Sequence, residues 1–299
     1  MESVTSQHPS AFSAPGRTWV RATGSVPSVS PTRSPTDPLD FSGRSIIVTG
    51  GTRGLGRVIA GTFLDAGADV VVCARNAPES PVTSTDGARS AMFVAADVRE
   101  PDQVYTVVAA AVEANGRLDV LVNNAGGAPP ADSATVSPRF NEKILALNLT
   151  GPMTFSQAAR QAMVESTSAS GGGVILNISS VSGSRPNPQG VAYGAAKAGL
   201  ENMGRTLAHE WGPEVRVVTV TVGLILTEES QQFYGDATGR AAVADNLAMK
   251  RLGDPSEVAD MCLVLASPLA RWVTGTSVEV HGGGEGPAYL GLAERANDG

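Results

Sequence analysis

The stretch of sequence that decides the fold is "SIIVTGGTRGLGRVIAGTFLDAGADVVVCAR", residues 45–75. It starts and finishes with short β-branched runs, at 45–50 and 68–75. Between them, a glycine-rich turn leads into a segment whose apolar residues recur at helical spacing. The stretch therefore predicts a strand, a tight turn, a helix and a second strand.

Five further apolar runs continue this alternation. They are 91–98, 118–126, 173–180, 215–223 and 276–283. Strands that are apolar almost throughout are typical of a parallel sheet covered on both faces, since a strand with one exposed face would alternate instead. The sequence therefore predicts a Rossmann-type, doubly wound α/β domain with about seven parallel strands, which forms a single domain over residues 41–285.

One connection in this alternation is expected to lack its helix. Residues 76–90, "NAPESPVTSTDGARS", carry Pro78, Pro81 and Gly87. Proline and glycine disfavour a continuous helix, so a loop or a single turn is predicted there.

The two ends of the chain are predicted to lie outside the domain. Residues 1–40 contain 8 Ser, 5 Thr and 6 Pro and show no periodicity, which indicates a disordered tail. An organelle transit segment is the alternative, but the prolines would break the amphipathic helix that it needs. Residues 286–299 are taken as a C-terminal extension.

Composition excludes several classes of function. A net charge of −7 argues against a nucleic-acid ligand, because such proteins usually show a basic face. No apolar run is long enough for a membrane span or a signal core, so a cytoplasmic protein is expected. Cys73 and Cys262 lie in apolar runs without metal-ligand spacing, which indicates reduced core thiols and no metal site.

The glycine-rich turn predicts a dinucleotide site. Residues 49–56, "TGGTRGLG", lie between a strand and a helix. Backbone N–H groups and the positive end of the helix dipole there can bind a pyrophosphate, and glycine lets the backbone approach it closely. A tight turn that binds no ligand is the alternative.

At this point the chain resembles the short-chain dehydrogenase/reductase family. The family's cofactor loop, TGxxxGxG, is matched by residues 49–56, and "NNAG" at 123–126 matches the motif of its fourth strand. The resemblance covers about residues 41–285. Within the family, the chain looks closest to 3-oxoacyl-acyl-carrier-protein reductases and carbonyl reductases.

The family's catalytic residues are matched as well. Asn148 lies in "ALNLTG", Ser180 closes "NISS", and "YGAAK" supplies Tyr193 and Lys197, with Tyr193 thirteen residues after Ser180 as is usual in the family. The resemblance implies that Tyr193 is the general acid for a carbonyl oxygen and that Lys197 holds the nicotinamide ribose and lowers the tyrosine pKa. It also implies that Ser180 binds the substrate oxygen and that Asn148 holds a water that relays protons.

Elementary chemistry supports the tyrosine and lysine pair independently. Residues four apart share one face of a helix, so Tyr193 and Lys197 can point into one cleft. A phenol with an unperturbed pKa of about 10 transfers protons near neutrality only if that pKa is lowered by roughly 3 units. A nearby ammonium in a desolvated cleft can supply much of this shift. The bland alternatives are an amphipathic core tyrosine and a solvated lysine.

The end of the second predicted strand favours NADP(H) over NAD(H). An acidic residue there would bind the ribose 2′-hydroxyl of NAD, but this chain has Ala74 followed by Arg75, which suits the 2′-phosphate of NADP. Arg53 resembles the second basic residue of NADP-preferring family members. Solvated surface arginines are the alternative.

The resemblance implies cofactor contacts by Gly50, Thr52, Arg53, Gly54, Leu55, Gly56, Arg75, Asn76, Asp97, Val98, Asn124, Ala125, Gly126, Tyr193, Lys197, Ile225 and Thr227.

The chain departs from the family pattern in two places. It has Val222 and Gly223 where a Pro-Gly pair is common, and the loss of that proline frees the segment that follows. His281 stands where aspartate is frequent, and a structural or subunit-contact role is predicted for it. His209 is predicted to lie on a helix surface.

Substrate identity is the least constrained prediction. The pocket wall is expected from residues 181–190 and 228–239, where Phe233 and Tyr234 could close an apolar pocket and Arg185 could meet an anionic group, unless they only pack or are solvated. An NADP(H)-dependent oxidoreductase for a carbonyl or alcohol on a medium-sized apolar or acyl substrate is predicted. An NAD-dependent alcohol dehydrogenase or a catalytically silent dinucleotide-binding scaffold is the alternative. The family also implies a homodimer or homotetramer.

Overall fold

The structure is a computed structural model that describes residues 37–167, 172–228 and 231–287. Residues 37–40 form a turn in which the Asp40 amide donates to the Asp37 carbonyl at 3.0 Å. The rest of the predicted N-terminal tail and nearly all of the predicted C-terminal extension lie outside the described residues.

A parallel sheet forms the centre of the described chain. Its strands occur in the order β3-β2-β1-β4-β5-β6-β7, and every neighbouring pair is parallel. The strands are β1 (Ser45–Thr49), β2 (Asp69–Ala74), β3 (Met92–Ala95), β4 (Val120–Asn123), β5 (Gly173–Ser180), β6 (Val215–Val222) and β7 (Ser277–Val280). The order reverses between β1 and β4, so the predicted doubly wound α/β fold is confirmed.

The apolar runs predicted as strands are buried on both faces of this sheet. Ile46 and Val48 face one hydrophobic core, whereas Ile47 faces the other. All three side chains are fully buried. Alternate residues of a strand point to opposite faces, so burial of both sets explains why the runs contain almost no polar residues.

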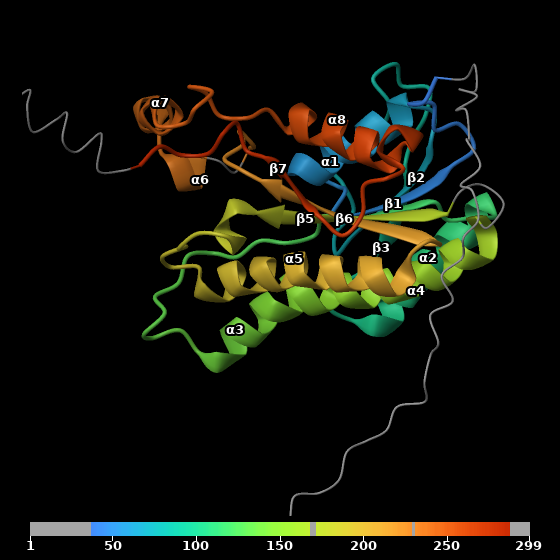
Figure 1. Ribbon diagram of the computed structural model, residues 1–299, viewed down its shortest axis with the longest axis horizontal. Helices are drawn as coiled ribbons and strands as arrows, with labels where there is room; N and C mark the ends of the chain where they lie inside the picture. Colours follow the sequence, from blue (N-terminus) through green and yellow to red (C-terminus); the bar gives the residue numbers. More distant parts are fainter. Residues whose placement is uncertain (1–36, 168–171, 229–230, 288–299) are drawn as a thin grey trace, which may run out of the picture. The chain divides into compact units, whose positions relative to one another are not determined.

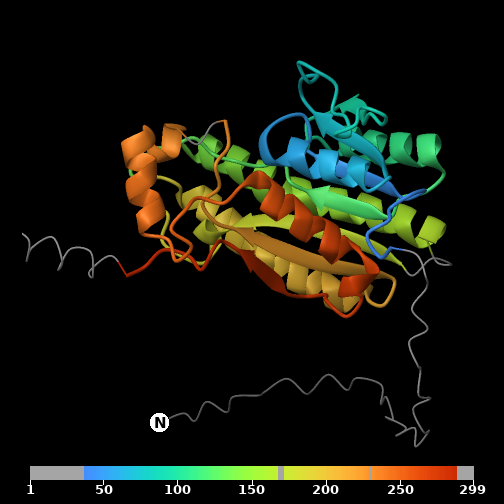
Figure 2. The same cartoon turned by 90° about the horizontal axis from the view of Figure 1, so that it is seen from above.

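Helices cover each face of the sheet. Their bounds are α1 (Gly54–Asp65), α2 (Pro101–Asn115), α3 (Pro138–Leu145), α4 (Gly151–Thr167), α5 (Val191–Trp211), α6 (Gln231–Tyr234), α7 (Ala237–Asp245) and α8 (Pro255–Ala266), with the short helices η1 (Ala146–Thr150), η2 (Val181–Gly183) and η3 (Pro268–Ala270). Residues of α1 and α8 pack into one core and those of α2, α4 and α5 into the other. Figure 1 shows the first pair above the sheet and the others below it, and Figure 2 shows the same layers from above.

The connection between β2 and β3 lacks a helix, as predicted. Residues 76–91 form turns, with an isolated antiparallel bridge between Thr83 and Ser90. Arg57 of α1 holds this connection by donating to the Ser80 and Pro81 carbonyls at 3.0 and 2.7 Å. A side chain of α1 therefore anchors this connection by hydrogen bonds.

β3 and β4 end earlier than the sequence predicts, as does β7, which stops at Val280 within the predicted run 276–283. The runs 91–98 and 118–126 yield strands that stop at Ala95 and Asn123. Beyond these points the backbone amides bond to polar side chains instead of to a neighbouring strand. The Asp97 amide donates to Gln103 Oε1 at 2.7 Å, and the Asn124 amide donates to Thr49 Oγ1 at 2.9 Å. The residues after both strands are thus in loops, where the predicted site requires them.

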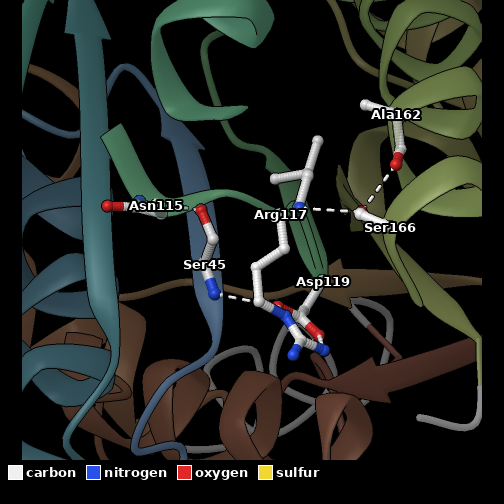
Figure 3. Close-up of polar contacts among 7 residues, drawn as sticks. Ser45, Asn115, Arg117, Asp119, Ala162 and Ser166 are labelled. Carbon is white, nitrogen blue, oxygen red and sulfur yellow. Dashed lines mark hydrogen bonds and ion pairs between the residues drawn. The ribbon is translucent and has the colours of Figure 1, made fainter. Parts of the chain in front are cut away.

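Asp119 secures the amino ends of β1 and β4. Its buried carboxylate accepts from the Ser45 amide at 2.9 Å and from both ends of the Arg117 guanidinium, at 2.8 and 2.6 Å. Figure 3 shows Asp119 together with Ser45 and Arg117. Nearby, the Leu118 amide donates to Ser166 Oγ at 3.1 Å, which ties α4 to the same end of the sheet. Sequence analysis did not single out Asp119.

We expect Asp119→Asn to destabilise the protein. The neutral amide cannot accept all three bonds, and a buried hydrogen bond to a charged group contributes about 2 kcal/mol. The free energy of unfolding, measured in urea at fixed protein concentration, should fall by about that amount.

Asp69→Asn is the matched control, because Asp69 pairs with Arg89 at 3.4 Å with both side chains about half exposed. Exposed pairs contribute about 0–1 kcal/mol. Equal losses in the two variants would contradict the role assigned to Asp119.

Candidate active site

The glycine turn after β1 forms a cradle at the carboxyl end of the sheet. A Cβ atom at Gly56 would collide with the Asn124 side-chain amide and the Gly50 carbonyl, and one at Gly50 would lie 3.0 Å from the Ala125 Cα. Gly54 has a φ of +51° and would place a Cβ in open space. Two glycines thus allow close packing of the turn, and the third leaves room above it for a ligand.

The start of α1 suits an anion. Its N-cap is Arg53, which gives the helix no side-chain cap, and the first turn, which lies wholly in the described chain, carries no acidic residue. The amide groups of Gly54, Leu55 and Gly56 form this first turn. Free helix N-termini carry a partial positive charge. The cradle and the helix end therefore fit a dinucleotide pyrophosphate, and its binding here stays a prediction.

Thr49 and Asn124 join the carboxyl ends of β1 and β4. Thr49 Oγ1 accepts from the Asn124 and Ala125 amides, each at 2.9 Å. Asn124 Nδ2 in turn donates to the Thr49 carbonyl at 2.9 Å. These bonds hold the turn after β4 against the glycine cradle.

Arg75 lies just beyond β2 with its side chain exposed. No hydrogen bond or ion pair within the described chain engages it. Asn76, also exposed, follows. The arginine is therefore available for a ligand at the site where the sequence predicts a 2′-phosphate.

Asp97 and Val98 follow β3. The Asp97 carboxylate accepts from Arg99 Nε at 2.9 Å and from the Arg99 amide at 3.0 Å. The hydrogen bond from Arg99, with a smaller contribution from the charge of Arg75, lowers the pKa of Asp97. Val98 is buried in the core that lies between the sheet and the helices α2 and α4. The adenine contact predicted for this pair stays a prediction.

Asn148 lies in η1, a π-helical turn between α3 and α4. It is fully buried, and its Nδ2 donates to the carbonyls of Gly127 and Ile144 at 3.0 and 2.9 Å. Its Oδ1 accepts from the Gly127 amide at 2.8 Å. The side chain therefore fixes the loop after β4, and both its N–H donors are used in doing so. Water binding by this side chain stays a prediction.

Lys197 is buried where β5, α5 and the loop after β4 meet. Its side chain is 4% exposed, and its Nζ donates to the Ile178 carbonyl at 2.7 Å. A Cβ at Gly126 would lie 3.2 Å from this Nζ and 2.7 Å from Asn148 Oδ1, so glycine is required there. Burial lowers the pKa of Lys197 to about 8.

Tyr193 lies one helical turn before Lys197, whose Nζ is 5.5 Å from the centre of the phenol ring. Burial raises the pKa of Tyr193, and a hydrogen bond with Ser180 lowers it by a smaller amount. Ser180 Oγ also accepts from the Ser182 amide at 3.2 Å. The structure thus brings Ser180, Tyr193 and Lys197 together, with the tyrosine pKa shifted upward instead of downward.

The two departures from the family pattern meet each other in space. A Cβ at Gly223 would collide with the backbone of His281, and the Gly223 amide donates to the Val280 carbonyl at 3.0 Å. His281 Nε2 lies 2.9 Å from Glu279 Oε2. His281 therefore packs at the end of β6, which agrees with the structural role predicted for it.

The residues predicted after β6 form part of a paired segment. Ile225 makes an isolated parallel bridge with Gly253, and the Leu226 amide donates to the Gly253 carbonyl at 2.8 Å. Thr227 follows in the same segment and has an interaction partner of its own. Their contact with a nicotinamide stays a prediction.

Sequence analysis missed one wall of the substrate region. A small apolar hollow beside Tyr193, about the size of one water molecule, is lined by Pro129, Val136 and Phe140 from the β4–α3 connection and α3. From α5 it is lined by Val191, Ala192 and Tyr193. No motif marks residues 128–140 of this connection and α3, so only the fold could bring them to Tyr193.

The chain is similar to several known proteins over most of its length. A family model described as enoyl-(acyl carrier protein) reductase matches residues 50–285. The rhamnolipids biosynthesis 3-oxoacyl-[acyl-carrier-protein] reductase of Pseudomonas aeruginosa is 32% identical over 249 residues, which is 82% of this chain and 97% of that protein.

Two solved structures are also similar. The Pseudomonas aeruginosa RhlG/NADP active-site complex is 31% identical with a TM-score of 0.76, covering 83% of this chain and 99% of that one. A 7α-hydroxysteroid dehydrogenase complexed with NADH and 7-oxo glycochenodeoxycholic acid is 29% identical with a TM-score of 0.74, covering 83% and 96%.

The chain therefore belongs to the short-chain dehydrogenase/reductase family and is an oxidoreductase of the type that acts on carbonyl and alcohol groups. Among the described residues, no helix is long and apolar enough to cross a membrane. Within that same part of the chain, no group of three or more His, Cys, Asp or Glu side chains is arranged to hold a metal ion.

The buried lysine predicts a pH dependence of stability. Its pKa is about 8 in the folded protein and 10.5 for a free lysine, so between these values the unfolded chain binds more protons than the folded one. The free energy of unfolding therefore gains up to about 1.4 kcal/mol per pH unit from this group as the pH rises. Lys197→Met removes this gain. The stability of the variant relative to wild type should be highest near pH 7 and should fall between pH 8 and 10 in urea titrations.

Loss of the hydrogen bond to Ile178 adds a difference that does not change with pH. Lys143→Met, at an exposed lysine of α3, is the matched control. Parallel stability curves for wild type and Lys197→Met would overturn the expectation.

Proposed function

We propose that the protein is an NADP(H)-dependent oxidoreductase that interconverts a carbonyl and a secondary alcohol on a medium-sized apolar or acyl substrate. The observation that carries the proposal is the meeting of Ser180, Tyr193 and the buried Lys197 at the carboxyl end of β5. The apolar side chains next to Tyr193, among them Val136 and Phe140, support an apolar substrate. The similarity to a 3-oxoacyl-[acyl-carrier-protein] reductase supports an acyl one.

The cofactor would be held along the carboxyl ends of β1, β2 and β4. The amides of the Gly50–Gly56 turn would bind its pyrophosphate, and Arg75 would bind a 2′-phosphate. Lys197 would donate to its nicotinamide ribose. A related structure with NADP and another with NADH keep the NAD-dependent alcohol dehydrogenase as the second candidate. The unengaged guanidinium of Arg75 favours NADPH.

The residues of the chain supply the proton side of the reaction. When bound, NADPH provides the hydride that adds to the carbonyl carbon. Tyr193 Oη donates its proton to the carbonyl oxygen, so hydride and proton together give the alcohol. Ser180 Oγ donates a hydrogen bond to the same oxygen. Burial keeps Tyr193 protonated at neutral pH, which suits the reductive direction, and the Lys197 ammonium stabilises the phenolate as it forms.

A catalytically silent dinucleotide-binding protein is the alternative from another class. Such a protein would have no need for a buried lysine beside a tyrosine, because burying an ammonium is costly. The retained, desolvated pair supports turnover.

The homodimer or homotetramer and the cytoplasmic location stay predictions. An apolar surface at Leu269 and Trp272, which are 55% and 96% exposed, would suit a subunit interface.

Tyr193→Phe tests the catalytic proposal. The variant keeps the ring but loses the transferable proton, and general acid catalysis contributes about 10²–10⁴-fold. We expect kcat for a panel of apolar and acyl ketones with NADPH to fall by at least about 100-fold, while NADPH binding, measured by fluorescence titration, is retained.

Tyr105→Phe is the control, since Tyr105 is half exposed on α2. Equal rates for wild type and Tyr193→Phe, or no turnover of any ketone by wild type, would refute the proposal.

Arg75→Ala tests the cofactor preference. Loss of a charge-assisted contact with the 2′-phosphate should raise the dissociation constant of NADPH by about 10- to 100-fold. Binding of NADH, which lacks this phosphate, should change by less than about twofold. Arg139→Ala, at an exposed arginine of α3, is the control. Equal losses for the two cofactors would exclude the role given to Arg75.

A further inference from the structure

An ion pair spans two segments near the active site. Arg185 lies in the loop between Ser180 and Tyr193, and one of its terminal nitrogens is 2.6 Å from Glu285 Oε1. The Arg185 amide also donates to the Val181 carbonyl at 3.2 Å, which fixes the base of the side chain. Sequence analysis suggested Arg185 as a receptor for an anionic group, and in the structure a carboxylate of the chain itself occupies it.

The backbone around Glu285 is held in place by the end of α7. Glu285 makes an antiparallel bridge with Leu247, and the Gly286 amide donates to the Asn246 carbonyl at 2.9 Å. The Ala248 amide donates to the Gly284 carbonyl at 3.2 Å. Figures 1 and 2 show α6, α7 and the segment after β7 together at one end of the sheet. Glu285 is thus presented to Arg185 by a fixed backbone.

Tyr234 of α6 connects the ion pair with the catalytic tyrosine. Burial raises the pKa of Tyr234, and Arg185, Glu285 and Tyr193 all act on its phenol through their charges. One phenol therefore lies within electrostatic range of the ion pair and of Tyr193. Arg185 itself lies in the loop that follows Ser180, so the ion pair lies beside the predicted substrate site.

Stability alone gives a weak reason for this pair. The Arg185 side chain is 43% exposed, and partly exposed ion pairs contribute little because water screens them. Its position between the catalytic loop and the region of α6 and α7 matters more for what can bind there.

We propose that Glu285 is a specificity-determining residue, whose carboxylate occupies Arg185 as an anionic group of a substrate would. This inference rests on the proposed carbonyl chemistry and refines its substrate class. The site then accepts neutral carbonyl compounds and rejects those that carry a carboxylate close to the reacting group. An anionic substrate would have to displace a carboxylate of high effective concentration and would meet its negative charge.

The kinetic experiment compares oxo-carboxylates with their ethyl esters. The series has two to five methylenes between the ketone and the carboxylate, and each pair is assayed with NADPH. In wild type the ester should have the higher kcat/KM. In Glu285→Gln, which frees Arg185 at constant size, the acid-to-ester ratio of kcat/KM should rise by about tenfold or more, mainly through a lower KM for the acid.

Two further variants sharpen the result. Adding Arg185→Gln to Glu285→Gln should return the ratio to near the wild-type value. Glu279→Gln is the matched control, because Glu279 bonds His281 and is exposed. A ratio that is the same in wild type and Glu285→Gln, with esters turned over, would overturn the inference while leaving the proposed function intact.

A binding measurement separates the inference from catalysis. Octanoate and octanamide are titrated by calorimetry into wild type and Glu285→Gln in the presence of NADP⁺. Octanoate should bind the variant about tenfold more tightly than wild type, and octanamide should not discriminate. Equal octanoate affinities would refute the role of Glu285 even if no ketone were reduced, whereas absence of ketone turnover alone would refute only the proposed function.

Discussion

The hydrogen bonds between Thr49 and Asn124 are the constraint on which the site depends. They join β1 and β4, the two strands between which the strand order reverses. Chains leaving these strands turn toward opposite faces of the sheet, which opens a crevice between them. The same asparagine amide fills the space that side chains at Gly50 and Gly56 would need, and the loop that follows carries Gly127 to Asn148. One pair of polar side chains thus fixes both walls of the crevice.

Beside this crevice, Tyr193 and Lys197 are removed from water, and this desolvation sets their pKa values. Lys197 Nζ donates to the Ile178 carbonyl and has a pKa lowered to about 8, while burial raises the pKa of Tyr193. The neutral form of each group is favoured separately, so the two pKa values move apart, with that of Lys197 below that of Tyr193. An ammonium beside a forming phenolate then costs less than either charge alone in the same place. The pair therefore stabilises the charges that form during proton transfer, and Tyr193 stays protonated before that step.

Local sequence signals predicted most of the fold and the centre of the site. Seven apolar runs became seven strands, and the prolines and glycine between β2 and β3 correctly predicted a connection without a helix. What could not be predicted depends on contacts between distant segments. Asp119 reaches Ser45 and Arg185 reaches Glu285 across large separations in the chain, and no local pattern marks either partner. The direction of the Tyr193 pKa shift was missed for the same reason, because burial is a property of the fold.

The two ends of the sheet show why function concentrates at one of them. At the amino end, Asp119 and Arg117 satisfy each other, and the Ser45 amide is bonded. On one face of the sheet, α8 begins with a complete capping box at Asp254, whereas α1 begins at the glycine cradle with no side-chain cap. Polar groups with protein partners contribute to stability, and groups without them can contribute to binding. By this criterion Arg75 and the start of α1 can bind a ligand, whereas the ion pair with Glu285 keeps Arg185 from binding one.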